Sequence, residues 1–582
     1  MKYLAGFLLL VCAICLRPAT AAEPFEYHAL GAPARPQVDV NWNRYRDYGQ
    51  ATKLLQDLAK AHPDYVRMQS LGKTYGKREM WLLTISDFAH GDVEEKPAFW
   101  IDGGIHANEI QAVEVVLYTA WFLLEKRGES EQIQRLLKER TFYLLPMMSP
   151  DARDAHFHEP NTTHSPRSGL RPVDDDGDGE VDEDGADDLD KDGHITQMRV
   201  RDKNGRWKAH EKFPELMVRV PDGERGEFTL LGVEGLDNDG DGEVNEDSDG
   251  YYDPNRDWAW NWQPGYVQRG AWRYPFSVEE NRMVRDFIVA HPQIAGAQTY
   301  HNAGGMILRG PGVKTDRFDA SDIAVYNALA EPAKKMLPGY RYINVANDLY
   351  EVYGGEFDWF HQMQGVFTFN NELWTPFNFF REHDGGGFFG SAENQHLFNQ
   401  RLLFGEALSP WREVDHPQYG RIEVGGFRKN FLRQPPSFLL EEESHRNMAF
   451  TLIHADEMPL LQIESASARS LGQGLVEVTV AIHNPKITPT HAAADVKNRI
   501  TRPDLVTIEG ADLQVSAGMQ SEDSLFRKFD EQIRRPEKIQ VENVPGRKTV
   551  FVRWLVTGKP PFQIQVSSIK GGQAEAKIIT LD

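Results

Sequence analysis

A histidine and a glutamate three residues apart are the first metal-binding groups that this sequence offers. His106 and Glu109 lie in the segment Gly103–Glu109, between a predicted short strand and a predicted helix. Imidazole nitrogen and carboxylate oxygen both suit Zn²⁺, which a catalytic site holds with three protein ligands and leaves open to water at the fourth position. A lone His-x-x-Glu pair also arises by chance, so the prediction of a zinc site requires a third ligand.

His301 is the best candidate for that third ligand. It follows the predicted strand 294–300, in the segment Gln298–Gly305. Functional side chains gather at the carboxyl ends of the strands in an open α/β sheet, where His301 would meet His106. The alternative is a polar loop histidine without a ligand role.

Three further motifs follow the His-x-x-Glu pair. They are Asn255-Arg256 within Asp253–Trp258, Tyr350 before Gly354-Gly355 and Asp358-Trp359, and Glu372 at the end of Phe367–Glu372. In this order, and together with the two histidines and Glu109, they resemble the motifs of zinc metallocarboxypeptidases of the carboxypeptidase A/B type. The resemblance covers roughly residues 35–415.

The resemblance implies a role for each matching residue. One zinc ion would be bound by His106, Glu109 and His301. Glu372 would take a proton from the zinc-activated water and deliver it to the leaving amine. Three residues would hold the terminal carboxylate of the substrate, namely Asn255, Arg256 and Tyr350.

Each of these assignments has a plainer alternative. Glu372 could be a surface acid, Arg256 a salt-bridge partner of a neighbouring aspartate, and Tyr350 an ordinary core aromatic. One position also departs from the family, because Asn370 stands where a threonine is usual.

The family also places an arginine between the zinc pair and the Asn-Arg pair, where it stabilises the developing oxyanion. Arg199 is our choice and Arg201 the alternative, and either could instead be a structural charge. In the family, the residue before the Asp-Trp pair helps to line the pocket for the C-terminal side chain. That residue is Phe357, which favours hydrophobic or aromatic side chains, although its neighbour Glu356 could weaken this preference.

The interval 155–252 contains an acidic repeat. Asp176–Asp184 and Asp239–Asp247 agree at eight of nine positions. Alternating carboxylates on a tight glycine-containing loop suit Ca²⁺, which takes six to eight oxygen ligands. The twelfth positions lack glutamate, so weak or shared calcium sites are expected; the alternative is a solvated acidic loop. The candidate ligands form three groups: Asp174, Asp176 and Asp178; Asp188, Asp190 and Asp192; and Asp237, Asp239 and Asp241.

The elements that must position these residues alternate between strands and helices. This alternation predicts an α/β domain with a mixed sheet flanked by helices. The interval 155–252 is predicted to be a long acidic loop inserted in it. Predicted helices cover 48–62, 107–126, 276–290 and 324–336; predicted strands cover 66–71, 80–85, 98–101, 141–145, 294–300 and 366–369.

The chain after about residue 459 has a different pattern. Short alternating runs such as 476–480, 550–554 and 562–566 are separated by turn residues, which is typical of a small β-sandwich. We therefore expect a signal peptide over 1–22, a catalytic domain over 35–445 and an all-β domain over 457–582.

Composition limits the cellular setting and the partners. Residues 1–22 have a lysine, an apolar core and small residues at the end, which predicts a signal peptide and a secreted or periplasmic protein. No other run is apolar and long enough to span a bilayer. Both cysteines lie in this signal, so the mature chain would have no disulfide, thiolate ligand or cysteine nucleophile. A net charge of −23 argues against nucleic acid as a partner.

The function predicted from these features is a secreted zinc carboxypeptidase that hydrolyses the C-terminal bond of peptides with a free carboxylate. One alternative is a calcium-dependent binding or adhesion protein whose peptidase-like domain is inactive. Joint retention of the zinc ligands and Glu372 argues against it, because binding needs no general base. Another alternative is a zinc amidase that acts on cell-wall peptides. The sequence leaves the oligomeric state open.

Overall fold

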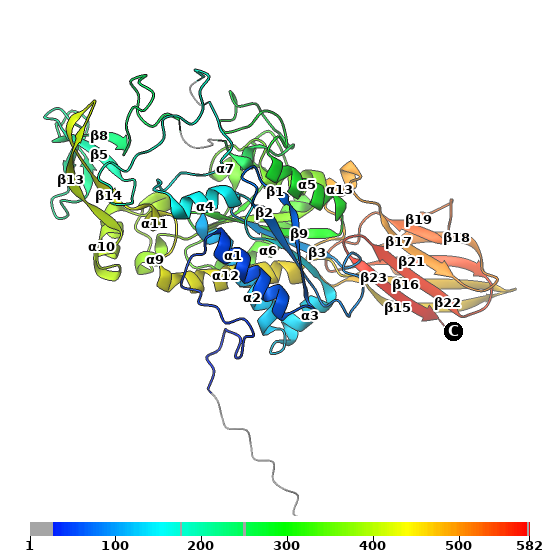
Figure 1. Cartoon of the computed structure of the whole chain (residues 1–582). Helices are drawn as coiled ribbons and strands as arrows, with labels where there is room; N and C mark the ends of the chain where they lie inside the picture. The colour runs from blue at the N-terminus through cyan, green and yellow to red at the C-terminus, as the bar shows by residue number, and fades with distance from the viewer. Residues whose placement is uncertain (1–26, 175–176, 248–251, 579–580, 582) are drawn as a thin grey trace, which may run out of the picture.

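The computed structural model describes residues 27–174, 177–247, 252–578 and 581. The predicted signal peptide and Asp176 lie outside these residues. A large mixed sheet with helices on both faces occupies the middle of the molecule, with a second sheet on one side and an all-β unit on the other (Figure 1). No described helix is long and apolar enough to cross a membrane.

The main sheet has eight strands in the order β1-β2-β4-β3-β9-β12-β10-β11. The central strands β4, β3, β9 and β12 run parallel, so their carboxyl ends meet at one edge. Every residue of β3 and β9 is buried, as expected for strands covered on both faces. The bounds are β1 Val66–Lys73, β2 Glu79–Ile85, β3 Ala98–Gly103, β4 Thr141–Leu145, β9 Ile294–Asn302, β10 Met306–Arg309, β11 Arg341–Asn344 and β12 Phe367–Leu373.

Alternate residues of the central strands face two different cores. Phe99 and Ile101 of β3 pack with helices α1, α2 and α12, whereas Ala98 and Trp100 pack with helices α5 and α8. Helix α6 covers β10 and β12 on the α12 side. These helices are α1 Tyr48–Ala61, α2 Ile110–Lys126, α5 Glu279–Ala290, α6 Ala320–Met336, α8 Glu356–Gln364 and α12 Ser437–Asp456.

Shorter helices complete this unit. They are α3 Glu131–Glu139, α4 Pro150–His158, α7 Val345–Asp348, α9 Phe377–Phe380, α10 Ala392–Leu402 and α11 Lys429–Leu432, with the 3₁₀ turns η1 Pro254–Arg256 and η2 Gly387–Phe389. Because α12 packs in the core of the main sheet, this unit extends past residue 445, its predicted end, to at least Asp456.

The prediction of a long inserted loop over 155–252 is wrong, because part of the interval forms strands. Four short strands of this interval form a six-stranded sheet with two strands from much later in the chain, in the order β13-β14-β5-β8-β6-β7. A small core that includes Met198, Ile422 and Val424 holds it together. The bounds are β5 Gln197–Arg201, β6 Trp207–Ala209, β7 Met217–Arg219, β8 Phe228–Val233, β13 Leu408–His416 and β14 Gly420–Phe427.

The all-β C-terminal unit consists of two sheets that share one apolar core. Five strands follow the order β15-β16-β21-β18-β19, and four follow β20-β17-β22-β23. The bounds are β15 Gln462–Gly472, β16 Leu475–Asn484, β17 Asp504–Glu509, β18 Gln514–Ser521, β19 Asp530–Glu531, β20 Lys538–Val541, β21 Lys548–Thr557, β22 Phe562–Ser568 and β23 Gly572–Ile578, with helix α13 at Ala493–Asn498.

Candidate active site

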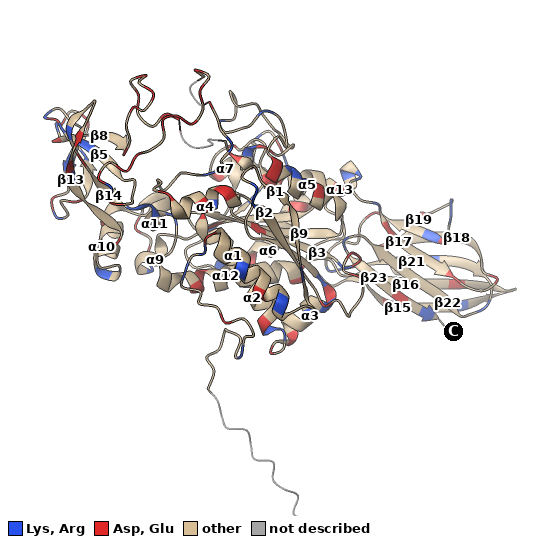
Figure 2. Ribbon diagram, in the orientation of Figure 1, with Lys and Arg blue, Asp and Glu red and all other residues tan. Residues whose placement is uncertain are grey.

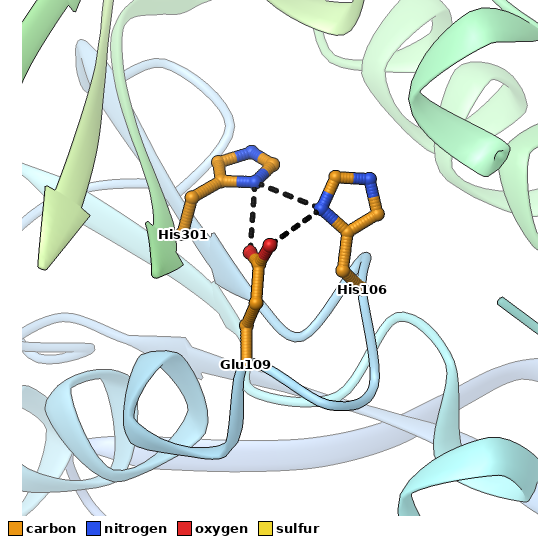
Figure 3. A group of neighbouring side chains, drawn as sticks. All are labelled: His106, Glu109 and His301. Carbon is orange, nitrogen blue, oxygen red and sulfur yellow. Dashed lines mark hydrogen bonds and ion pairs between the residues drawn. The ribbon is translucent and has the colours of Figure 1, made fainter. Parts of the chain in front are cut away.

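Three predicted metal ligands converge at the carboxyl edge of the main sheet (Figure 3). His106 lies in the loop after β3, Glu109 directly precedes α2, and His301 is near the end of β9. His106 Nδ1 is 3.0 Å from Glu109 Oε1 and 3.3 Å from His301 Nδ1, and His301 Nδ1 is 3.1 Å from Glu109 Oε2. All three side chains are buried.

The local sequence explains this convergence. Gly103 lets the loop pass close to α2, because a Cβ there would lie 2.8 Å from the Ala112 carbonyl oxygen. Gly104 has φ +67°, a left-handed conformation that favours glycine. Glu109 occupies the N-cap of α2 but makes no capping bond, and its carboxylate instead faces the histidines.

The donor set fits a zinc ion. The ligand atoms of the two histidines and the glutamate lie within 4.8 Å of one another, and two imidazoles with one carboxylate are a catalytic zinc set. Although burial raises the pKa of Glu109, the two imidazoles hold it well below its usual range, so the ligand is ionised. His106 Nε2 lies 2.9 Å from Asp253 Oδ1, and donation to this carboxylate leaves the Nδ1 lone pair for the metal.

The Asn-Arg motif borders this cluster through Asp253, which precedes η1. Asp253 Oδ1 accepts a hydrogen bond from the Asn255 backbone amide at 2.8 Å and so caps the turn. Arg256 Nη1 lies 3.7 Å from Asp253 Oδ2, and Asn255 Oδ1 accepts from the Glu356 amide at 2.9 Å. Burial raises the pKa of Asp253, but Arg256, His106 and Arg167 hold it well below the usual value.

Glu372 lies beside the cluster because β12 pairs with β9. In the parallel register Glu372 is opposite His301, so both side chains leave the same face of the sheet. Burial, and then the Glu109 carboxylate, raise the pKa of Glu372 to about 7. Tyr350, which follows α7, is 52% exposed. Burial raises its pKa above the usual value, and Arg256 offsets only part of this increase.

Two arginines that the sequence argument missed also reach the cluster. Arg167, in the loop after α4, places Nη1 3.2 Å from Glu109 Oε1 and Nε 3.4 Å from Asp253 Oδ2. Arg433, before α12, places Nη1 3.8 Å from Glu109 Oε1 and donates to the Asn302 carbonyl oxygen at 3.0 Å. Arg433 lies far from the motifs along the chain, so no local pattern marked it.

Arg199, our choice for the oxyanion arginine, is not brought to the cluster. It lies on β5 of the second sheet, where Nε donates to Glu423 Oε2 at 2.6 Å and the guanidinium stacks 3.9 Å from the Trp411 ring. Arg201, the alternative, is on the same strand and 3.6 Å from Glu423 Oε1. Their charges are thus used within the second sheet, whereas Arg167 contacts the ligand cluster.

Comparison with known proteins identifies the family. A family model described as zinc carboxypeptidase matches residues 51–173 and 221–388, which together make half of the chain. The chain belongs to the zinc carboxypeptidase family. The unmatched gap between the two segments contains Arg199, whereas Arg167 lies inside the match. A model described as a domain of unknown function matches residues 460–579.

Curated relatives match over shorter segments. Carboxypeptidase O of Bos taurus is 32% identical over 114 residues, 19% of this chain and 29% of that protein. Carboxypeptidase B of Astacus astacus is 30% identical over 129 residues, 22% and 40% of the two chains. An inactive metallocarboxypeptidase of Saccharomyces cerevisiae is 33% identical over 113 residues, 19% and 26%. The chain thus spans between a quarter and two fifths of these relatives.

Two solved structures also align with the chain. Thrombin-activatable fibrinolysis inhibitor aligns with a TM-score of 0.43 and 16% identity, covering 71% of this chain and 74% of that one. Carboxypeptidase A of Helicoverpa armigera aligns with a TM-score of 0.40 and 18% identity, covering 57% and 66%.

The remaining predicted site residues are Phe357, in an apolar cluster, and the acidic residues of the interval 155–252. Phe357 is buried in an apolar cluster with Met306, Leu308 and Val352. The acidic residues line the loops between the second sheet and the main sheet (Figure 2). Asp237, Asp239 and Asp241 gather as predicted, and Asp188 and Asp190 gather with Glu234. Asp192 instead accepts from the Ser409 hydroxyl, Asp178 groups with Glu183 and Asp239, and Asp174 accepts from the Gly177 amide.

Proposed function

We propose that the chain is an exported zinc carboxypeptidase that removes the C-terminal residue of peptides with a free carboxylate. The observation that carries this proposal is the position of Glu372 directly opposite His301, beside a buried ligand cluster. A zinc ion held by these ligands would supply Lewis-acid chemistry, polarising the scissile carbonyl and lowering the pKa of a water. A binding protein has no need for a general base at this position.

The side chains around the cluster divide the remaining work. The Glu372 carboxylate accepts the proton of the attacking water and returns it to the leaving amine. The Arg167 guanidinium, held by Glu109 and Asp253, donates to the oxyanion. Arg256 and Asn255 bind the terminal carboxylate of the substrate, and Tyr350, which is half exposed, closes over it.

Digestion of a peptide library by the zinc-loaded full chain, followed by mass spectrometry, tests this proposal. We expect successive loss of single C-terminal residues, and we expect matched peptides with an amidated C-terminus to stay intact. Cleavage restricted to cell-wall peptides would instead support the amidase alternative. Absence of any cleavage by zinc-loaded protein would favour the binding alternative.

We further propose that the acidic repeats bind Ca²⁺. Carboxylates of the two repeats face each other. Burial, and then Asp247 of the second repeat, raise the pKa of Glu183 in the first repeat to about 7. Burial, and then Asp184 of the first repeat, raise the pKa of Glu246 in the second repeat to about 7. Asp239 groups with Asp178 and Glu183 and also with Asp184 and Glu246. A cation would relieve the repulsion between these facing carboxylates.

Calorimetric titration of the zinc-loaded chain with CaCl₂ tests the calcium proposal. We expect saturable binding that Asp239→Asn weakens, because this residue belongs to both groups. Asp222→Asn, an exposed acid outside the repeats, is the matched control. If CaCl₂ produces no larger heat changes with the wild-type chain than with the Asp239→Asn variant, the calcium sites are ruled out.

A further inference from the structure

A row of buried oxygen atoms lies one layer beneath the candidate active site. In the strand register Asp102 of β3 is opposite Thr299 of β9, which is opposite Asn370 of β12. Thr299 and Asn370 precede His301 and Glu372 by two residues, so they leave the same face of the sheet one layer deeper. That face is the one on which Trp100 and Ala297 pack against residues of α8.

Glu356, the first residue of α8, completes this row. Its backbone amide donates to Asn255 Oδ1 at 2.9 Å, which ties it to the residue proposed to bind the substrate carboxylate. Its carboxyl lies beside that of Asp102, and each shifts the pKa of the other. We call Asp102, Thr299, Asn370 and Glu356 the oxygen row; their side chains are at most 2% exposed.

Most side-chain oxygen atoms of the oxygen row have no hydrogen-bond partner among the described residues. Within the described chain, no hydrogen-bond partner reaches Asp102 Oδ1, Thr299 Oγ1 or Asn370 Oδ1, and the Glu356 carboxylate oxygens face only the Asp102 carboxyl. Only Asp102 Oδ2 has a donor, Trp100 Nε1 at 2.5 Å. Buried polar atoms in folded proteins are nearly always paired, so this number of unpaired oxygens in one row points to a missing donor.

The row also lacks a counter-charge. Burial raises the pKa of both Asp102 and Glu356, and no described lysine, arginine or histidine is among the groups that shift them. Two adjacent buried carboxyls without a cation must retain a proton. A cationic group with several N–H donors would satisfy the charge and the unpaired oxygens together.

The surroundings suit a long side chain with a charged tip. Leu308 continues the row on β10, opposite Asn370, and belongs to the apolar cluster of Phe357 and Val352. One end of the row is therefore apolar and the other end is acidic. Lysine and arginine side chains have this same division, with an aliphatic stem and a cationic head.

We propose that the oxygen row receives the cationic side chain of the C-terminal substrate residue, so that the enzyme selects peptides ending in lysine, arginine or another diamino acid. This inference rests on the proposed carboxypeptidase function. From Phe357 alone, a preference for hydrophobic or aromatic C-terminal side chains was expected. In the present proposal Phe357 contacts the aliphatic stem of the substrate side chain, while Glu356 and Asp102 select its charge.

The test compares peptides that differ only in their C-terminal residue, lysine against norleucine, with the zinc-loaded full chain. Norleucine keeps the aliphatic stem and lacks the ammonium group. A site built to pair a substrate N–H group discriminates strongly against an analogue without it, so we expect kcat/KM for the lysine peptide to be at least about 100-fold higher. Equal or better hydrolysis of norleucine-, leucine- or phenylalanine-ended peptides would overturn the inference and leave the proposed function intact.

A variant assigns the preference to the row. Glu356→Gln should lower kcat/KM for the lysine peptide and so remove most of its advantage over the norleucine peptide. Glu351→Gln, an exposed acid in the segment before α8, is the matched control. A lysine preference that persists in Glu356→Gln would refute the assignment.

Binding provides a readout that needs no turnover. The zinc-loaded Glu372→Gln variant should bind the lysine-ended peptide more tightly than the norleucine-ended one in calorimetry. Equal affinities would mean that Asp102 and Glu356 form only a structural pair that shares a proton. Absence of hydrolysis by wild-type protein would refute the proposed function, whereas this binding comparison decides the inference separately.

Discussion

At the scale of single residues, Glu372 sets the pH dependence of the proposed reaction. Burial, and then Glu109, raise its pKa to about 7, whereas His301, Arg167 and Arg433 oppose this shift. A bound zinc ion adds positive charge nearby and lowers the pKa further. Only the ionised carboxylate accepts a proton, so activity must fall as the pH falls through the pKa of Glu372.

We therefore expect kcat/KM to decline on the acidic side with an apparent pKa at or below about 7. The measurement is a pH–rate profile, with zinc content determined at each pH to separate protonation of Glu372 from loss of the metal. A rate that increases on acidification, at constant zinc content, would show that Glu372 does not act as the base.

Arg167 and Arg199 form a matched pair for the oxyanion role. Arg167 contacts Glu109 and Asp253, while Arg199 is held by Glu423 in the second sheet. Loss of one oxyanion donor lowers kcat by about 10²–10³-fold, so we expect this loss in Arg167→Ala. Arg199→Ala should keep kcat and lower only thermal stability. The reverse pattern would restore Arg199 to the role that the sequence suggested.

At the scale of elements, the sequence predicted strands best where every residue of the strand is buried. The apolar runs of β3, β9 and β12 marked the strands. His106, Glu109 and His301 were predicted from their types and positions, whereas Glu372 came from the resemblance to zinc metallocarboxypeptidases. The second sheet was missed because its strands within 155–252 are short, lie among Asp, Gly and Pro residues, and pair with residues after 408. Arg167 and Arg433 were missed because they lie in irregular segments, which have no periodic pattern.

The turn η1 gives a prediction about how elements support the metal. Asp253, before η1, is 2.9 Å from His106 Nε2 and holds the ring so that Nδ1 faces the other ligands. Removing such a partner typically weakens metal binding by about 10–100-fold. We expect Asp253→Asn to raise the zinc Kd, measured by chelator competition, by this factor. Asp222→Asn is the exposed control, and an unaltered Kd for Asp253→Asn would disprove the supporting role.

At the scale of the whole molecule, a buried polar network joins the all-β unit to helix α8 of the main-sheet unit. Lys570 Nζ donates to the Gly365 carbonyl oxygen at 2.8 Å and lies 3.2 Å from Asp495 Oδ2. His491 stands between Asp495, at 3.3 Å, and Asp504, at 3.1 Å. Burial lowers the pKa of His491, but the two aspartates outweigh it and raise the pKa to about 9.

This network predicts how stability depends on pH. Because the folded-state pKa of His491 lies above the unfolded value of about 6.5, its contribution is fully present below pH 6.5 and is lost as the pH rises through about 9. We expect the melting temperature of the all-β unit to fall over this window and to fall less in His491→Gln. His383→Gln, which replaces an exposed histidine, is the control. If this variant alters the pH profile of the melting temperature as much as His491→Gln does, the explanation is contradicted.

The most direct test of the central claim measures zinc content and turnover on the same samples of wild type and Glu372→Gln. We predict one zinc per chain in both proteins, and loss of single C-terminal residues by the wild type at a rate about 10²–10⁴-fold above that of the variant. Equal turnover by the two zinc-loaded proteins, or no turnover by the wild type, would contradict a carboxypeptidase that uses Glu372 as its base.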